Sequence, residues 1–284
     1  MKTFRGLAVV AAVAVYLQVV LGSVVRITGS GLGCPDWPLC HGAIVPAFEY
    51  HTMIEYAHRL VGTSAGLLMV ATAGCAFVLY RRGIKGEVPG GLVVASVGAL
   101  LLIVAQGIVG GITVLMKNSP FTVAIHLGNA ELVLGAAILV ALWAARAARG
   151  RIAIPTRRLG TPVILVGLAG AYLVVVTGAI VVGTGASGAC SSWPLCGGTG
   201  RLADTHMLHR AVVLLGSLAI LGAVHSARRR WRGQRLGVAA YVVGALLVAE
   251  VAVGAAQVLN GLPAALRSIH VALASGVWGG MVLL

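Results

Sequence analysis

Four histidines are the residues in this sequence whose type and spacing most clearly indicate chemistry. They lie in two pairs of similar segments: AHRLVG with LHRAVV, 151 positions apart, and AIHLGNA with SIHVALA, 144 positions apart, which give His58, His209, His126 and His270. Ionisable side chains inside apolar segments are rare and usually functional. Two neutral imidazoles facing each other across a helix bundle suit the axial positions of haem iron. The pattern predicts one bis-histidine haem site in each half; a proton relay or another metal site is the alternative, although zinc usually takes three or four ligands.

A single carboxylate distinguishes the two halves. Glu55 precedes His58 by three residues, which places both side chains on one face of a helix. The equivalent position before His209 holds His206. A carboxylate beside a porphyrin could accept a proton or stabilise a developing cation, whereas the structural alternative is an acid in the first turn of a helix. The asymmetry suggests one catalytic site, containing Glu55, and one haem that transfers electrons.

Other polar and small residues accompany the histidines. Arg59 and Arg210 directly follow His58 and His209, and each could pair with haem propionates or extend to the membrane surface. Nearby glycines could leave room for a flat macrocycle or allow close helix packing. The glycines concerned are Gly62, Gly66, Gly110, Gly111 and Gly254. Three polar residues inside apolar segments have no partner that the sequence identifies: Gln106, Glu131 and Glu250.

The elements that must position these residues are membrane-spanning helices. Of the 284 residues, 59% are hydrophobic and 10% are charged, against about 25% charged residues in soluble domains. A transmembrane helix needs about 20 mostly apolar residues. Eight segments meet this requirement: 6–25, 53–80, 92–115, 122–145, 162–183, 205–226, 237–259 and 268–284. The sequence therefore predicts an all-α polytopic membrane protein.

The basic residues predict how the chain is oriented. The formal net charge of +14 alone would suggest nucleic acid, but fifteen of the 21 Lys and Arg residues flank one side of the predicted helices. By the positive-inside rule that side is cytoplasmic. Both termini then lie in the cytoplasm, and the histidines lie toward the outer face. Basic loops on the inner face need no partner beyond anionic membrane lipid, so we expect no nucleic-acid partner.

Two similar cysteine-bracketed loops fall on the opposite, outer side of the membrane. They are CPDWPLC at 34–40 and CSSWPLC at 190–196. Disulfides persist outside the cytosol, and five intervening residues allow each pair, Cys34–Cys40 and Cys190–Cys196, to close a small local disulfide. We expect the first pair, above the half with Glu55, to affect function and the second to be mainly structural.

The chain is an internal duplication. YLQVVLGSVVRITGSGLGCPDWPLCHG, from Tyr16, aligns without gaps with YLVVVTGAIVVGTGASGACSSWPLCGG, from Tyr172. Each half contains four predicted helices, and an even number preserves orientation, so the halves are expected to be parallel repeats. We expect two four-helix bundles, 1–150 and 151–284, joined by a basic linker at 145–160.

These motifs together resemble the heme A synthase family over nearly the whole chain. The residues that carry the resemblance are EYAHR (55–59), CPDWPLC (34–40), MLHR (207–210), CSSWPLC (190–196), His126 and His270. The resemblance implies an enzyme of the bacterial cell membrane that oxidises the C8 methyl group of heme O to a formyl group. Two successive hydroxylations, followed by loss of water, would complete that reaction.

The resemblance also implies a role for each half. The N-terminal half would bind substrate heme O between His58 and His126, with Glu55 as the catalytic carboxylate. The C-terminal half would hold heme B between His209 and His270. Heme O synthase and the cytochrome oxidase assembly machinery would be partners, and the electron acceptor is left open. Three alternatives remain at this stage: a di-heme membrane cytochrome b, a disulfide–quinone oxidoreductase and a transporter.

Overall fold

The computed structural model describes residues 1–82, 88–150 and 162–284. The described residues contain eight helices that are long and apolar enough to cross a membrane. They are α1 (Lys2–Ile27), α2 (Tyr50–Arg81), α3 (Gly90–Leu115), α4 (Pro120–Ala147), α5 (Pro162–Gly183), α6 (Arg201–Arg230), α7 (Arg235–Leu259) and α8 (Ala264–Leu283). The predicted polytopic all-α class is confirmed, and the chain is a multi-pass membrane protein. A short 3₁₀ helix, η1 (Ala186–Gly188), lies between α5 and α6.

Polar caps explain why two of these helices begin before the apolar segment itself. The Glu49 side chain accepts a hydrogen bond from the backbone N–H of Thr52 and so caps α2. Ser119 caps α4 through the N–H of Thr122, and Pro120 follows it at the first helical position. Both arrangements satisfy backbone donors at a helix start. These starts lie ahead of the segments chosen by hydropathy because the capping turn is polar.

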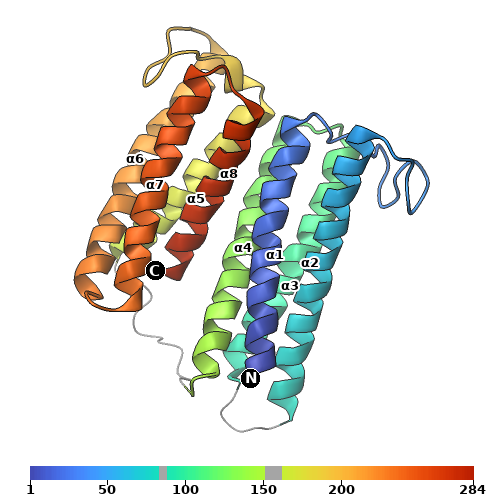
Figure 1. Cartoon of the computed structure of the whole chain (residues 1–284), viewed down its shortest axis with the longest axis vertical. Helices are drawn as coiled ribbons and strands as arrows, with labels where there is room; N and C mark the ends of the chain where they lie inside the picture. Colours follow the sequence, from blue (N-terminus) through green and yellow to red (C-terminus); the bar gives the residue numbers. More distant parts are fainter. Residues whose placement is uncertain (83–87, 151–161) are drawn as a thin grey trace.

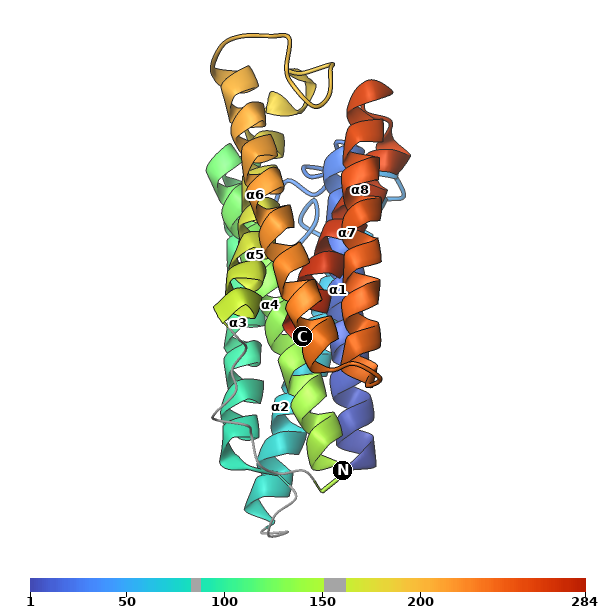
Figure 2. The ribbon, with the colours of Figure 1, turned by 90° about the vertical axis from the view of Figure 1, so that its left-hand side faces the viewer.

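The helices form two bundles, α1–α4 and α5–α8 (Figure 1). Both cysteine-bracketed loops lie at one end of the molecule, and the N-terminus lies at the other. The view turned by 90° shows the helices of both bundles running along the same long axis (Figure 2). Residues 151–160 of the predicted linker lie outside the described residues.

A pair of equivalent tyrosines joins the bundles where α1 and α4 meet α5 and α8. The Tyr16 hydroxyl of α1 donates to the Ala272 carbonyl of α8 at 3.0 Å. The Tyr172 hydroxyl of α5 donates to the Gly128 carbonyl of α4 at 3.3 Å. The tyrosines are 156 positions apart and the acceptors 144 apart, which are the offsets of the repeat. The two halves are therefore related by an approximate two-fold axis that runs between them.

Glu131 and Ser275 meet at this axis. They are 144 positions apart and so occupy the same place in the two repeats. The Ser275 hydroxyl donates to Glu131 Oε1 at 2.6 Å, and Glu131 is fully buried. The indole N–H of Trp278 donates to the Glu131 carbonyl at 2.7 Å. These bonds place polar contacts inside an otherwise apolar interface.

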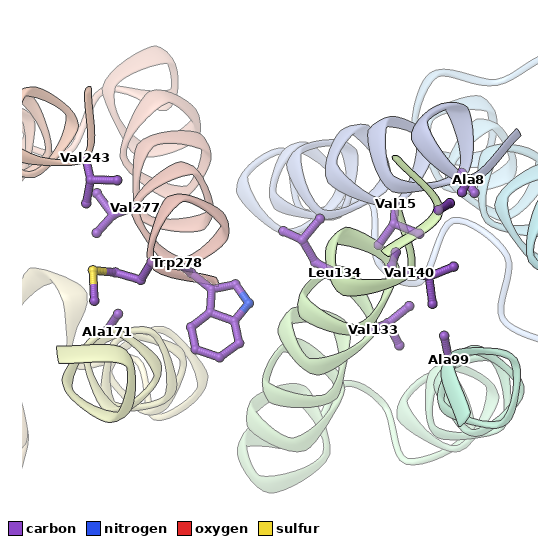
Figure 3. Packing of buried hydrophobic residues seen from close by; sticks show 14 of the residues in the cluster. Ala8, Val15, Ala99, Val133, Leu134, Val140, Ala171, Val243, Val277 and Trp278 are labelled. Atoms are coloured by element: carbon purple, nitrogen blue, oxygen red, sulfur yellow. The ribbon is translucent and has the colours of Figure 1, made fainter. Parts of the chain in front are cut away.

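Apolar packing surrounds these hydrogen bonds. Leu134 of α4 and Trp278 of α8, which are again 144 positions apart, both project into the boundary between the bundles (Figure 3). A Cβ on Gly135 would come within 3.1 Å of the Trp278 ring, and one on Gly279 within 3.0 Å of Ile138. Small residues at these equivalent positions allow the helices to approach closely, as is typical of membrane helix interfaces.

Candidate functional site

Each of the four candidate ligand histidines faces a glycine on the preceding helix. The nearest atom to the position of a Cβ on each glycine is the histidine Cε1. The distances are 3.1 Å for Gly22 and His58, 3.0 Å for Gly110 and His126, 3.3 Å for Gly178 and His209, and 3.1 Å for Gly254 and His270. A side chain at any of these positions would press on the ring. At each of the four positions the glycine therefore leaves room for the histidine ring.

The four glycines follow the internal repeat. Gly22 and Gly178 are 156 positions apart, and Gly110 and Gly254 are 144 apart. General helix packing does not require a glycine opposite every one of the four histidines. The repetition therefore connects these glycines with the histidines.

The glycines predicted to make room for a macrocycle fall into four groups by what they face. Gly110 and Gly254 do face histidine rings. Gly62 instead faces the amide of Gln18, 2.9 Å from its Cβ position, and Gly66 has no such contact within 4 Å. Gly111 lies against the Trp37 ring, whose nearest atom is 2.7 Å from its Cβ position, so Trp37 of the first cysteine loop packs on α3.

The histidine rings form two pairs at equivalent depth. His58 on α2 and His126 on α4 belong to the first bundle, and His209 on α6 and His270 on α8 belong to the second. All four rings are half-buried, and each lies in the first three turns of an even-numbered helix, near the end that carries the cysteine loops. Each half thus presents one ring from each of two helices.

In the second half, the contact to each histidine is made by an oxygen atom at Nδ1. The Thr177 hydroxyl lies 2.9 Å from His209 Nδ1. Glu250 Oε1 lies 2.9 Å from His270 Nδ1. Thr177 and His209 are hydrogen-bonded, whereas His270 Nδ1 makes no hydrogen bond among the described residues in spite of its distance to Glu250.

In the first half, the contact comes from glutamine amide nitrogens. Gln18 Nε2 lies 3.0 Å from Nδ1 and 3.3 Å from Nε2 of His58, and it donates to the His58 carbonyl at 3.0 Å. Gln106 Nε2 lies 3.2 Å and 3.3 Å from the same ring atoms of His126, and it donates to the His126 carbonyl at 3.0 Å. The two halves therefore present different chemistry to otherwise equivalent rings.

Glu55 is fixed to the first cysteine loop. Its Oε2 accepts the backbone N–H of Cys34 at 2.9 Å, and its Oε1 accepts from Arg59 Nη2 at 2.6 Å. Arg59 also donates to three carbonyl groups of the loop: Cys34, Asp36 and Leu39. Glu55 is 3% exposed, and its charge is compensated by the guanidinium one helical turn away. The carboxylate is thus held against the first cysteine loop, and its residue precedes His58 by three positions on α2.

The two candidate propionate-binding arginines differ in what they contact. All four Nη hydrogens of Arg59 are accounted for by the bonds to Glu55 and the loop. Arg210 donates from Nη1 to the Pro194 carbonyl at 2.9 Å, whereas its buried Nη2 has no hydrogen-bond partner among the described residues. Arg210 therefore has a buried donor for an anionic group, and Arg59 serves mainly to hold the loop.

His206 occupies the place that corresponds to Glu55. It is 6% exposed, and its Nδ1 lies 3.2 Å from the Ala186 carbonyl in η1. Both residues thus connect the start of an even-numbered helix to the preceding outer loop. Only Glu55 supplies a carboxylate.

Both predicted disulfides, Cys34–Cys40 and Cys190–Cys196, are present. Asp36 closes the first loop by accepting the N–H groups of His41 at 2.6 Å and Gly42 at 2.7 Å. The Gly42 hydrogen bond, with that from His41, lowers the pKa of Asp36 below its ordinary value.

The sequence did not identify Gln18 and Thr177 as site residues. A signal was present in part, since QVVLG (18–22), QGIVG (106–110) and EVAVG (250–254) each place a polar residue four positions before a histidine-facing glycine. Within the described part of the chain, no group of three or more His, Cys, Asp or Glu residues is arranged to hold a metal ion by itself.

The comparisons with known proteins agree on the family to which the chain is similar. A family model for COX15-CtaA, described as cytochrome oxidase assembly protein, matches residues 5–282. The heme A synthase of Symbiobacterium thermophilum is 32% identical over 98% of this chain and 93% of its own length. That of Bacillus licheniformis is 28% identical over 98% and 93%, and that of Geobacillus kaustophilus is 30% identical over 91% and 83%.

Proposed function

The chain belongs to the COX15-CtaA family and is an enzyme of heme A biosynthesis, and on this premise we propose that it converts heme O to heme A by oxidising the C8 methyl group to a formyl group. The observation that carries the proposal is an asymmetry. Each of the two equivalent histidine pairs faces glycines, and only in the first does a carboxylate, Glu55, stand three residues before the histidine, where the second has His206. A di-heme cytochrome b would need the histidine pairs but not Glu55, and the comparisons do not favour it.

The first half is proposed to bind the substrate. His58 and His126 would take the iron of heme O, and Gly22 and Gly110 leave room for the Cε1 side of these rings. Glu55, fixed three residues before His58, would accept a proton from the substrate carbon as oxidation proceeds. Its two hydrogen bonds orient it without the need for rearrangement, which is the arrangement expected of a pre-organised catalytic group.

The second half is proposed to hold heme B. His209 and His270 would hold it; Thr177 Oγ1 lies 2.9 Å from His209 Nδ1, and Glu250 Oε1 lies 2.9 Å from His270 Nδ1. The buried Nη2 of Arg210, which lacks a partner among the described residues, would bind a propionate. When bound, the haem supplies one-electron redox chemistry. The two histidines and the buried arginine donor are residue types that fit a haem with its propionates.

The orientation in the membrane is part of the proposal. The uneven charge distribution supports cytoplasmic termini and histidine pairs toward the outer face. Heme O synthase would supply the substrate, and cytochrome oxidase assembly would use the product.

The test is formation of heme A in membranes that contain a source of heme O and no other heme A synthase. Extracted haems are separated and identified as pyridine hemochromes. We expect heme A with the wild-type chain, and heme O only with Glu55→Gln, while the second-half haem spectrum persists. Glu49→Gln, in an exposed capping residue of the same helix, is the matched control and should convert heme O normally. Absence of heme A with the wild-type chain overturns the proposal.

A further inference from the structure

We propose that an apolar groove between α1 and α2 receives the isoprenoid side chain of heme O and makes the first half selective for heme O over heme B. The proposal rests on the proposed function, and it adds a subsite for a part of the substrate that does not react. Heme O and heme B share the porphyrin, the iron and the propionates. They differ at one substituent, which is a long isoprenoid chain in heme O and a vinyl group in heme B.

The groove lies between the last two turns of α1 and the first two turns of α2, at the end of the molecule that carries the cysteine loops (Figure 1). Its volume is about 310 Å³, at the lower end of the range of small-molecule sites. Glu49 lies at its rim and turns its carboxylate to the N–H and hydroxyl of Thr52. The side chains that make the groove apolar are Leu21, Val24, Phe48, Met53, Ile54 and Ala57.

The groove adjoins the first histidine pair. Ile54 precedes His58 by four residues and therefore shares its face of α2. On α1, the position of Leu21 is also next to the histidine, as the second half shows: Thr177, the counterpart of Leu21, lies 2.9 Å from His209 Nδ1. A substituent at the edge of a porphyrin held by His58 would therefore enter the groove.

The internal repeat shows which groove residues are particular to the first half. The offset between the halves is 156 for α1 and 151 for α2, and four groove positions change at these offsets. Leu21, Met53, Ile54 and Ala57 correspond to Thr177, Asp204, Thr205 and Leu208. Three of the second-half residues are polar, and the fourth replaces a small side chain directly before the histidine by a large one. The difference between the halves thus matches the difference between the two haems.

Lipid acyl chains are the alternative occupant of an apolar groove in a membrane protein. Equivalent positions of the two parallel repeats lie at equivalent depth, so contact with lipid alone would favour the same residue types in both halves. The second half instead carries Asp204, which is exposed, and Thr205 at these positions. Lipid contact also gives no reason for alanine before one histidine and leucine before the other. The asymmetry therefore favours the chain of the substrate.

The experiment titrates the purified full-length protein, with heme B retained in the second half, with either heme O or heme B. The Soret absorbance of the added haem reports binding to the first half. For the wild-type chain we expect heme O to bind at least about tenfold more tightly than heme B, because its chain buries apolar surface. Ala57→Leu introduces the second-half residue and should remove this preference by weakening heme O alone. Ile54→Thr, which introduces a hydroxyl group into the groove, should act in the same direction.

A matched control is available on the same helix. Ala71→Leu makes the same change at an exposed position of α2 outside the groove, and it should keep the wild-type preference. The heme B spectrum of the second half shows whether each variant is folded, and Ile54→Thr carries the test if Ala57→Leu is not.

Two results would overturn the inference and leave the proposed function intact. In the first, the wild-type chain has no preference or the folded groove variants keep it, and the groove is then a lipid contact. In the second, the groove variants weaken heme O and heme B equally, which means that they act on His58 and not on the isoprenoid chain. A wild-type first half that binds neither haem overturns the proposed function as well.

Discussion

The carboxylate of Glu55 accepts the backbone N–H of Cys34 at 2.9 Å, although the two residues are 21 positions apart in the chain. The first disulfide loop and the candidate catalytic residue are therefore one structural unit, completed by Arg59. The second half has no equivalent, because His206 contacts the Ala186 carbonyl in η1 instead. Several predictions depend on this difference between the halves.

Replacement of Arg59 by lysine should impair conversion of heme O. Arg59 donates to Glu55 and to three loop carbonyls at once, and a single ammonium group cannot reproduce this fork. We expect Arg59→Lys to lower heme A formation at least about tenfold, equivalent to ~1.4 kcal/mol, with the second-half haem spectrum unchanged. Arg201→Lys, in an exposed residue, is the control. Wild-type conversion in Arg59→Lys would show that the clamp is dispensable.

The two disulfides should differ in their effect. Replacement of both Cys34 and Cys40 by serine should reduce heme A formation, because the loop backbone that holds Glu55 is released. Replacement of both Cys190 and Cys196 should lower stability by about 2 kcal/mol, as expected for a short closed loop, while conversion continues. Haem extraction and thermal unfolding in detergent measure the two effects. Equal loss of conversion in both double variants would contradict this division.

A side chain at a histidine-facing glycine should expel haem from that half alone. Gly178→Val should displace the His209 ring and lower the haem content of the second half at least about tenfold, ~1.4 kcal/mol. Gly22→Val should do the same to heme O binding at His58. Pyridine hemochrome stoichiometry reports both. Gly66→Ala, whose Cβ would meet nothing within 4 Å, should retain both haems; haem loss in that variant would point to general helix disruption.

The first loop should lose order only in acid. Hydrogen bonds from Gly42 and His41 lower the pKa of Asp36 in the folded protein. The ionised Asp36 carboxylate therefore stabilises the folded loop above the unfolded pKa of about 3.9, and this stabilisation is lost as the pH falls through the lower pKa of the folded state. Amide exchange at Gly42 should therefore stay protected at pH 5 and increase only below about pH 4. Asp36→Asn should be unprotected at both pH values. Protection that is lost near pH 6 would implicate a histidine instead.

The contact between Glu131 and Ser275 should contribute modestly to stability. Hydrogen bonds between membrane helices average about 0.6 kcal/mol and reach about 1.7 kcal/mol. Ser275→Ala leaves a buried carboxyl group without its donor, so we expect it to destabilise by an amount near the upper value. A double-mutant cycle with Glu131→Gln, measured by unfolding in detergent, isolates the pair. A coupling energy of zero would mean that the contact adds nothing to the interface.

The sequence predicted the helices well because each apolar segment had to be long enough to cross the bilayer. The four histidines stand out in the sequence because the duplication marks them twice, and their role as haem ligands stays a prediction. Gln18 was missed because its role depends on the rotation of α1 against α2, and its repeat counterpart is Val174. The partner of Glu131 was not predictable either, because only the packing of the two bundles brings it to Ser275.

The Glu131–Ser275 contact also constrains how the molecule could have been assembled. In a symmetric homodimer of half-length chains, a residue on the two-fold axis meets its own copy. Two glutamates in that place would bury two carboxyl groups against each other, at considerable electrostatic cost. Within a single chain the two repeats can carry different residues at the position on the axis, so the contact no longer has to be between identical side chains. An acid facing a serine is not open to a symmetric homodimer, and two copies of the first half could not reproduce it.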